Sequence, residues 1–299
     1  MISRCSPDTY PGSVCLAAIL KGEEAFTDEW ILYHRMLGVS HFFLYDDDEA
    51  APLKTFLRPH RDYVTVIPWH GKSQSLPGRD RQTKAYLHAL HHGALGYEWV
   101  AFLDGDEFIT LRKHAHLQEF LSQFPRAGSI SLQWHVFGHN GYYDDPPGLI
   151  TASLTRRMHN PDRNVKTISR TACIADITTA HFCRLQAGYR VDANNRNFTE
   201  ELYPGKSDIA HINHYQCRSF KRWMERVVRG VPCLDAPAQV APHDLWRTDA
   251  DECLKKFVTT VALNKNEFVD EFMLRYQEPL EAAVAEIRLK RAHQRKVPR

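Results

Sequence analysis

Apolar residues form short continuous runs in the first third of the chain, and segments of helical character separate these runs. The runs lie at Val14–Leu20, His41–Asp46, Tyr63–Trp69 and Glu98–Leu103. Continuous rather than alternating apolar runs are typical of strands that are covered on both faces of a parallel sheet. Since strands alternate with helices, we expect right-handed crossovers and a mainly parallel, Rossmann-like twisted sheet flanked by helices, that is, an α/β fold.

The segment after the first run has the apolar spacing of an amphipathic helix. Glu23–Leu37 carries apolar and aromatic residues at intervals of three and four, and it ends at Gly38, a common helix stop. Asp80–Leu95 is also predicted to be helical. The opening unit is therefore predicted to be strand, turn and helix.

The pattern changes beyond Phe108. We predict a short helix at His116–Phe124 and strands at Ser129–Trp134 and Thr167–Ala175, with a loop rich in Gly, Asn, Asp and Pro up to Pro147. Residues 194–207 are expected to be loop. Three helices are predicted near the C-terminus, at Ser219–Arg229, Asp249–Leu263 and Glu267–Arg291. These patterns suggest an α/β domain over residues 1–216 and a helical extension packed on it over residues 217–299.

Composition narrows the class of protein. The 299 residues are 43% hydrophobic and 25% charged, with a formal net charge of +2, which is typical of a soluble globular protein. A protein with a net charge near zero has no strong positive electrostatic field to attract a polyanion, so a nucleic-acid partner is not expected. Val14–Leu20 is far shorter than the roughly 20 apolar residues of a membrane span.

The N-terminal residues and the cysteines suggest a compartment. No basic and apolar leader with a small-residue cleavage site precedes Val14, so we expect the protein to stay in the cytoplasm. The seven cysteines are scattered and form no CxxC pair, which fits neither a disulfide framework nor a zinc knuckle. We expect reduced thiols.

The motif DGDEF, Asp104–Phe108, is the sharpest candidate for chemistry. It follows the apolar run WVAFL directly, and ligands of open parallel sheets bind at the carboxyl ends of the strands. Two carboxylates one residue apart can reach one hard cation together and leave coordination sites for phosphate oxygens. Asp-x-Asp also occurs at 46/48 and 249/251, so the spacing alone carries little weight. The alternative is a strand-end turn or a salt-bridge cluster.

Two further clusters could contribute to a site. In HINHY, His211 and His214 lie three residues apart, and a neutral imidazole would suit a manganese-type ion, although the chain holds 17 histidines. WHVFGHNGYYDD, Trp134–Asp145, mixes aromatic rings, amides and carboxylates around glycines, which suits stacking and hydrogen bonding to sugars. A loop anchored in the core by its aromatic residues explains this second cluster equally well.

Weaker signals leave two interpretations each. Asp46 ends a strand at the same sheet edge and could contact a ribose or a base, or it could simply form an acidic turn. Lys166 and Arg170 could hold a diphosphate or belong to a solvated strand face. The tail Ile287–Arg299 carries six Lys and Arg and no acidic residue. It is either a solvated helix end or a weak peripheral contact with an anionic membrane surface, such as the inner membrane face.

Taken in order, five segments resemble the GT-A glycosyltransferases of family 92 and related family-2-like enzymes. They are KGEEAFTDEWILYHRMLGVSHFFLYDDD, RDRQTKAYLHALHHGALGYEWVAFLDGDEF, QWHVFGHNG, VKTISRT and HINHYQCRSFKRWMERVVRG, and the resemblance covers roughly Val14–Gly230. NKNEFVDEFMLRY, Asn264–Tyr276, resembles the closing helix of the family. The resemblance implies a GT-A nucleotide-sugar-binding and catalytic domain over residues 1–216.

The resemblance also implies roles for residues at matching positions. Asp104 and Asp106 would chelate a divalent ion, Mn²⁺ or Mg²⁺, that is bound to the diphosphate of a nucleotide sugar, and His214, with His211 second, would complete the metal site. The base and ribose would lie near Lys21, Glu23 and Asp46, where Gly22 replaces the usual asparagine of the family. The residues matching positions that face the donor are Arg79 and Gln82, and Lys166 is a further donor candidate.

The expected reaction follows from these assignments. A metal-dependent, inverting transfer would move a hexose from a nucleotide sugar, UDP-linked by expectation, to a glycan or lipid-linked saccharide. Trp134, His139 and Asn140 are the candidates for acceptor binding, and Asp144 and Asp145 are the candidates for the general base. Two alternatives stay open: a non-catalytic nucleotide- or glycan-binding module, and a nucleotidyltransferase. The second would need a glycine-rich, basic loop after the first strand, which this chain lacks.

Overall fold

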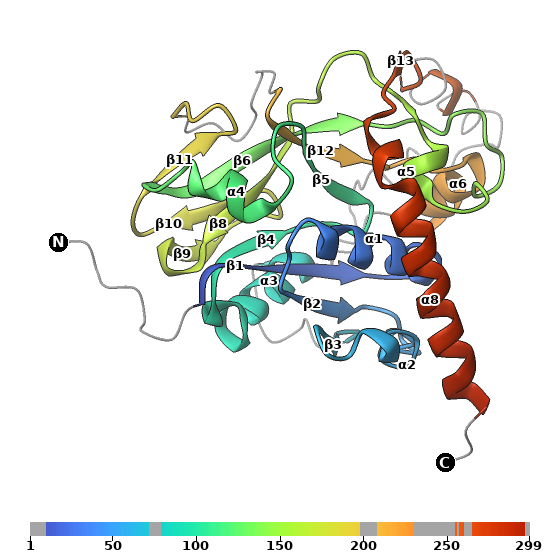
Figure 1. The fold of residues 1–299 in the computed structure, drawn as a ribbon, viewed down its shortest axis with the longest axis horizontal. Coiled ribbons are helices and arrows are strands. Elements are labelled where there is room, and N and C mark those ends of the chain that lie inside the picture. Colours follow the sequence, from blue (N-terminus) through green and yellow to red (C-terminus); the bar gives the residue numbers. More distant parts are fainter. Residues whose placement is uncertain are drawn as a thin grey trace.

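The computed structural model describes residues 10–71, 79–197, 208–229, 255, 257–259 and 265–296. In the first half of the chain, strands and helices alternate as the apolar pattern predicts (Figure 1). The strands are β1 (Tyr10–Leu20), β2 (His41–Asp46), β3 (Val64–Pro68), β4 (Tyr97–Phe102), β5 (Glu107–Leu111), β6 (Ala127–Val136), β7 (Arg156–Arg157), β8 (Val165–Arg170), β9 (Ile174–Ile177), β10 (Cys183–Leu185), β11 (Tyr189–Asp192), β12 (Ala210–His214) and β13 (Phe268–Val269). The α-helices are α1 (Glu24–Met36), α2 (Leu53–Phe56), α3 (Arg81–His92), α4 (Leu117–Ser122), α5 (Ile150–Ser153), α6 (Phe220–Arg229) and α8 (Gln277–Lys296). The 3-10 helices are η1 (Arg58–His60), η3 (Ala94–Gly96), η4 (Thr171–Cys173) and η6 (Phe272–Tyr276).

Nine strands of the described chain form one sheet in the order β3-β2-β1-β4-β8-β6-β12-β5, with β11 also paired to β6. Strands β1 to β4 run parallel to one another, β8 runs antiparallel to both β4 and β6, and β5 runs antiparallel to β12. The carboxyl ends of β1, β2 and β4 therefore meet at one edge of the sheet. The prediction of an α/β fold with a mainly parallel sheet flanked by helices is confirmed, including the C-terminal helix.

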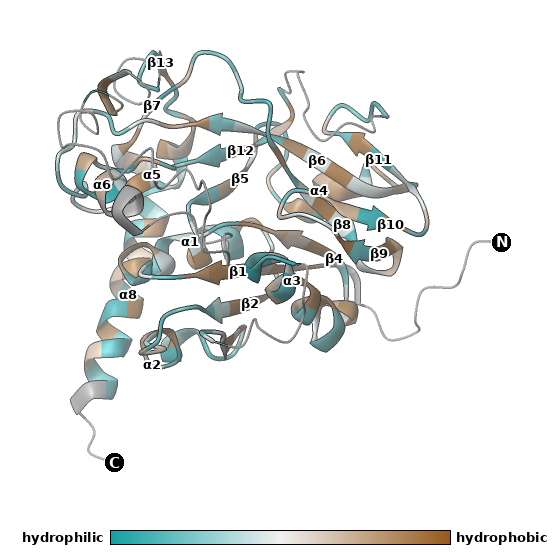
Figure 2. Ribbon diagram, turned by 180° about the vertical axis from the view of Figure 1, so that it is seen from behind, coloured by the Kyte–Doolittle hydropathy of each residue, from teal (hydrophilic) through white to brown (hydrophobic). Residues whose placement is uncertain are grey.

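The central strand β1 is buried on both faces. Leu16 and Ala18 belong to the same core cluster as Trp30 of α1, whereas Cys15 belongs to a second cluster with Tyr86 of α3. The two helices lie on opposite faces of the sheet, with α1 in front in Figure 1 and α3 in front in the reverse view of Figure 2. Burial on both faces is the reason that the run Val14–Leu20 is continuously apolar.

Helix α1 is joined to β5 by buried hydrogen bonds. Trp30 donates from Nε1 to the carbonyl of Glu107 at 2.8 Å, and the Tyr33 hydroxyl donates to the carbonyl of Ile109 at 2.7 Å. Because His34 Nδ1 lies 2.8 Å from the Trp30 carbonyl, Nδ1 carries the proton and Nε2 accepts the Ile109 N–H. Burial lowers the pKa of His34 to about 3, so the ring stays neutral. These bonds fix the turn between β4 and β5.

Several segments differ from the predicted secondary structure. Strands β5 and β12 form where the sequence predicted none, and the strand predicted at Thr167–Ala175 is divided into β8, η4 and β9. The helix predicted at Glu267–Arg291 is wrong in its first third, where β13 and η6 precede α8. Asp270 explains this, because its carboxylate accepts from the Phe272 N–H and pairs with Arg157, which ties the segment to β7.

Helix α8 follows one side of the molecule and packs on α1 (Figure 1). Of the six basic residues in the tail, Arg291 points inward, where its guanidinium binds both carboxylate oxygens of Asp28 at 2.7 and 2.9 Å.

Residues 297–299 lie outside the described residues, as do 198–207 and most of the helix predicted at Asp249–Leu263. No helix in the described part of the chain combines the length and apolar character needed to span a membrane. The domain division at residue 216 stays a prediction.

Candidate active site

The DGD motif forms the turn between β4 and β5, at the sheet edge where the carboxyl ends of β1, β2 and β4 meet. Within the turn, the Glu107 N–H donates to the carbonyl of Asp104 at 3.1 Å. A Cβ atom on Gly105 would lie 2.6 Å from Leu20 Cδ2, so a glycine allows the turn to pass close to the end of β1. The sequence predicted the position of this motif correctly.

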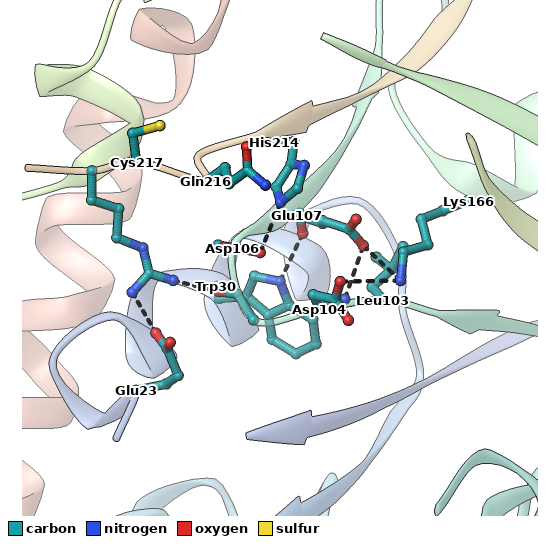
Figure 3. Close-up of polar contacts among 12 residues, drawn as sticks. Glu23, Trp30, Leu103, Asp104, Asp106, Glu107, Lys166, His214, Gln216 and Cys217 are labelled. Carbon is teal, nitrogen blue, oxygen red and sulfur yellow. Dashed lines mark hydrogen bonds and ion pairs between the residues drawn. The ribbon is translucent and has the colours of Figure 1, made fainter. Parts of the chain in front are cut away.

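Asp104 is held by neighbours on both carboxylate oxygens. Figure 3 shows its contacts with Lys166 and Glu107. Its Oδ1 accepts from the Gln82 amide of α3, and its Oδ2 lies 3.2 Å from the Lys166 ammonium of β8. The same ammonium lies 3.4 Å from Glu107 Oε2, which in turn accepts from the Asp104 N–H at 2.9 Å. Asp104 is thus oriented by residues of two strands, β5 and β8, and of helix α3.

The charges of this cluster are coupled. Burial raises the pKa of the Asp104 carboxyl, but the Lys166 ammonium more than offsets this, so the pKa lies below its usual value. Burial would likewise lower the pKa of Lys166, yet Asp104 and Glu107 raise it above its usual value. The Lys166 side chain, which is 1% exposed, therefore remains an ammonium ion.

Asp106 lies beside His214 because β12 pairs antiparallel with β5, which sets His214 opposite Glu107. His214 Nε2 lies 3.3 Å from Asp106 Oδ1, and the Tyr215 N–H donates to the Asp106 carbonyl at 2.8 Å. The ring of His214 also packs against Trp134, with 4.3 Å between the ring centroids. The structure thus brings together two of the three predicted metal ligands.

Asp106 and His214 fit a divalent ion. Their two ligand atoms are separated by 3.3 Å, close to the roughly 3 Å between neighbouring ligands of an octahedral ion with bonds of about 2.1 Å. Asp104, by contrast, does not join them in a compact group of three, because its oxygens face Gln82 and Lys166. A carboxylate suits manganese or magnesium, the imidazole favours a manganese-type ion, and the other coordination positions are left for phosphate oxygens.

One group of three described residues has ligand atoms within 4.8 Å of one another, and it contains the other histidine of HINHY. It consists of His135, His211 and Asp270. The two imidazoles are stacked with 3.9 Å between centroids and 15° between planes, so their in-plane lone pairs do not converge. Asp270 Oδ2 is already bound by Arg112 and Arg157. This group is a buried structural contact, and His211 does not lie beside Asp106.

A pocket of about 450 Å³ opens beside the DGD turn. Among the described residues, the cations that line it are Lys21, Arg218 and Arg222. Arg218 is buried, pairs with Glu23, and donates to the Gly105 carbonyl at 3.4 Å. Burial lowers the pKa of Arg218, but Glu23 more than compensates, so the pKa is raised. The lining of the pocket therefore combines carboxylates with cations, groups that suit a metal ion and an anion bound to it.

The predicted donor-binding residues divide into two groups. Lys21, Glu23, Gln82 and Asp104 line the pocket. Asp46, Arg79 and Lys166 do not line it. Asp46 accepts from the N–H groups of the following turn, Arg79 pairs with Asp176 at 2.8 Å, and Lys166 faces the carboxylates described above.

Of the residues predicted to bind the acceptor, some line the pocket and others do not. Trp134 lines the pocket, whereas His139 and Asn140 contact Asn266 of the C-terminal segment. The candidate bases Asp144 and Asp145 do not line the pocket either. Asp144 is exposed and pairs with Lys221 at 3.5 Å, and Asp145 pairs with Arg222 at 2.8 Å and accepts from Ser219. Neither aspartate reaches the DGD turn in this structure.

Sequence reasoning missed several residues of the pocket. Asp47 rather than Asp46 faces it, and Thr178–His181 at the turn between β9 and β10 forms one wall. Arg218 has a positive φ of 46°, which is uncommon outside glycine and marks a constrained position. The only sequence signal for Arg218 was its place inside the segment HINHYQCRSFKRWMERVVRG.

Comparison with known proteins agrees with this geometry. The family model described as glycosyltransferase family 92 matches residues 10–256. A family 92 protein of Oryza sativa subsp. japonica is 29% identical over 186 residues, covering 60% of this chain and 30% of the relative. A family 92 protein of Ricinus communis is 26% identical over 227 residues, covering 74% and 38%, respectively. One of Arabidopsis thaliana is 24% identical over 234 residues, covering 73% and 37%. The chain thus spans between 30 and 38% of the length of these curated relatives.

Proposed function

The chain belongs to glycosyltransferase family 92, and from this premise we propose that it transfers a hexose from a nucleotide sugar to a saccharide acceptor with the help of a divalent metal ion. The observation that carries the proposal is the pair Asp106 and His214, which lies in a 450 Å³ pocket at the carboxyl end of β4. UDP is the nucleotide that we expect, and the GT-A type is the fold that we propose.

Asp106 and His214 would hold the ion, manganese or magnesium. Bound to a diphosphate there, such an ion offsets the negative charge that develops on the departing nucleotide. Asp104 contributes a fixed negative charge, because Lys166 and Gln82 orient its carboxylate. Lys21, Arg218 and Arg222 can neutralise phosphate oxygens that the ion does not contact.

The acceptor would enter on the side of Trp134. Its ring lines the pocket and packs against both His214 and His181, with centroid distances of 4.3 and 5.3 Å. Aromatic rings bind the CH faces of sugars, while the polar groups around them bind the hydroxyls. These contacts support a glycan or lipid-linked saccharide as acceptor.

We expect inversion at the anomeric carbon. A retaining enzyme with a covalent intermediate needs a carboxylate that is free to attack. In the described part of the pocket, Glu23, Asp47 and Asp104 are each paired with a cation, and Asp80 accepts from the Thr83 N–H at the start of α3. Asp106 faces His214. Direct displacement by the acceptor hydroxyl avoids the need for such a nucleophile.

Location and membrane contact belong to the same proposal. The four cysteines in the described residues, Cys15, Cys173, Cys183 and Cys217, are free thiols, which supports a reducing compartment such as the cytoplasm. Weak contact of the basic C-terminal helix with an anionic membrane surface remains a prediction. Arg291 is not available for such a contact, because Asp28 holds it.

Thermal unfolding with UDP, GDP, CMP and ADP, each with and without Mn²⁺, tests the function. A ligand that binds only the native state stabilises it by about 2.7 kcal/mol at a hundredfold excess over its Kd. We expect a rise in Tm with one nucleoside diphosphate, UDP first, that requires the metal. Asp106→Asn should abolish the metal-dependent part of this rise.

The control is Asp62→Asn, which makes the same change from carboxylate to amide at a side chain that is 87% exposed. It should keep the full metal-dependent rise. If no nucleotide raises the Tm of the wild-type protein in the presence of Mn²⁺, the proposed function is wrong. A rise that persists in Asp106→Asn would remove Asp106 from the metal site.

A further inference from the structure

The turn between β9 and β10 forms a wall of the pocket. Thr178, Thr179, Ala180 and His181 all line the pocket there. Two hydrogen bonds hold the turn together: the Thr179 hydroxyl accepts from the N–H groups of His181 and Phe182 at 3.1 and 3.0 Å. His181 is the only titratable side chain that this turn contributes to the pocket lining in the described structure.

Hydrogen bonding fixes the tautomer of His181. Its Nδ1 lies 2.9 Å from the backbone carbonyl of Val165. A carbonyl oxygen can only accept, so Nδ1 must carry the proton, and Nε2 of the neutral ring is left with a lone pair. No described residue donates to Nε2. The arrangement resembles a general base whose second nitrogen is held by an acceptor.

The charges around His181 keep it neutral. Burial lowers the pKa of His181, and the nearby Lys166 ammonium lowers it further. Asp104 acts in the opposite direction, and His214 adds to the lowering. A neutral imidazole at neutral pH is the form that can accept a proton.

The acidic groups of the pocket are poorer candidates for this task. Glu23 is paired with Arg218, Asp47 with Arg81 at 2.8 Å, and Asp104 with Lys166 at 3.2 Å. These carboxylates are already engaged by cations, so they are less free to approach an acceptor hydroxyl. Asp144 and Asp145, predicted from the sequence as bases, do not line the pocket.

We propose that His181 is the general base of the transfer and that Nε2 receives the proton of the acceptor hydroxyl. This role rests on the proposed function. In the step, the acceptor oxygen forms a bond to the anomeric carbon while the bond between that carbon and the phosphate oxygen breaks. The electron pair of the broken bond stays on the nucleoside diphosphate, and the hydroxyl proton moves to Nε2 of His181. The neighbouring Trp134 ring would bind the acceptor sugar.

The test compares two kinds of acceptor in one variant. The donors are the hexose derivatives of the nucleotide that raises the Tm, and release of the nucleoside diphosphate is measured. The acceptors are a mixture of oligosaccharides, whose hydroxyls must lose a proton, or azide, which has no proton to lose. The variant His181→Asn places an amide N–H where Nδ1 lies, so it can keep the bond to Val165 while Nε2 is removed. His91→Ala, at an exposed histidine of α3, is the control.

We expect transfer to oligosaccharides to fall by about 10²- to 10⁴-fold in His181→Asn, the range typical of a general base. The rate of transfer to azide should stay close to the wild-type rate. The metal-dependent rise in Tm with nucleotide should also stay close to that of the wild-type protein. Oligosaccharide transfer at the wild-type rate would overturn the role, and so would a parallel loss of both transfers. If the proposed function itself is wrong, the wild-type protein will show no rise in Tm with any nucleotide and will release no nucleoside diphosphate. That result differs from both outcomes for His181→Asn.

Discussion

At the scale of single residues, the buried ammonium of Lys166 balances the charge of the carboxyl groups in the DGDEF turn. The sequence suggested a contact with diphosphate, but the structure directs the nitrogen to Asp104 and Glu107, 3.2 and 3.4 Å away. Glu107 is fully buried, and burial raises its pKa well above its usual value, although Lys166 opposes this shift. The cluster is therefore sensitive to the loss of one charge.

Lys166→Met should destabilise the protein by about 3–5 kcal/mol, because it leaves the buried Glu107 carboxyl and the partly buried Asp104 carboxylate without their cation. The double variant Lys166→Met with Glu107→Gln should recover part of this loss, since a neutral amide is less costly to bury. Urea unfolding at pH 7 measures both changes. Lys54→Met, at an exposed lysine of α2, should change the free energy of unfolding by less than about 0.5 kcal/mol. A loss below about 1 kcal/mol in Lys166→Met would contradict the buried ion-pair assignment.

At the scale of elements, a partly buried ion pair between Arg291 and Asp28 joins helix α8 to α1. Arg291 binds both oxygens of Asp28, and its guanidinium lies 3.7 Å from the Phe56 ring centroid of α2. His60 of η1 contacts Asp28 Oδ1 at 2.9 Å. Three helical segments thus converge on one carboxylate. Burial raises the pKa of Asp28, but His60 and Arg291 outweigh burial, and the pKa is lowered from 3.8.

The lowered pKa sets a pH window for this contact. The unfolded state binds the proton more tightly than the folded state, so the stabilisation is complete above the ordinary value of 3.8 and is lost as the pH falls toward the folded value. Asp28→Asn should cost about 3 kcal/mol at pH 7 and progressively less below pH 4. Urea unfolding across this range, compared with Glu286→Gln at an exposed pair, measures the difference. An equal cost at pH 7 and pH 3 would argue against the ion pair.

At the scale of the whole molecule, the loop after β6 holds the C-terminal segment. The Asn140 N–H donates to Asn266 Oδ1 at 2.9 Å, although the two residues are 126 positions apart. A Cβ atom on Gly138 would lie 2.4 Å from the Lys265 carbonyl oxygen and 2.3 Å from Asn266 Oδ1. His139 and Asn140 of the predicted acceptor loop thus have a structural contact here.

Gly138→Ala should force this contact apart and cost about 1–3 kcal/mol, the range for an added methyl in a packed site. Hydrogen exchange of residues 266–276 should accelerate in this variant. Gly96→Ala is the matched control, because a Cβ atom there would meet nothing within 4 Å. Unchanged exchange in Gly138→Ala would show that the loop and the C-terminal segment are not coupled.

The sequence by itself determined the elements with strong local patterns. Continuous apolar runs located β1 to β4, and the three-and-four spacing located α1. In the central strand β1, burial on both faces allows no polar alternation, whereas the edge strand β3 is only partly buried. The same logic placed Asp104 and Asp106 at the carboxyl end of a buried strand. Ordered motifs from Lys21 to Gly230 indicated the family.

Only the tertiary structure decided which side chains share the pocket. His214 reaches Asp106 through the pairing of β12 with β5, and Lys166 reaches Asp104 because β8 pairs with β4. His181 lines the pocket from a short turn with no pattern of its own. Contacts between residues so far apart along the chain depend on strand order and register. Local periodicity does not encode these, because it reports only which face of an element is buried.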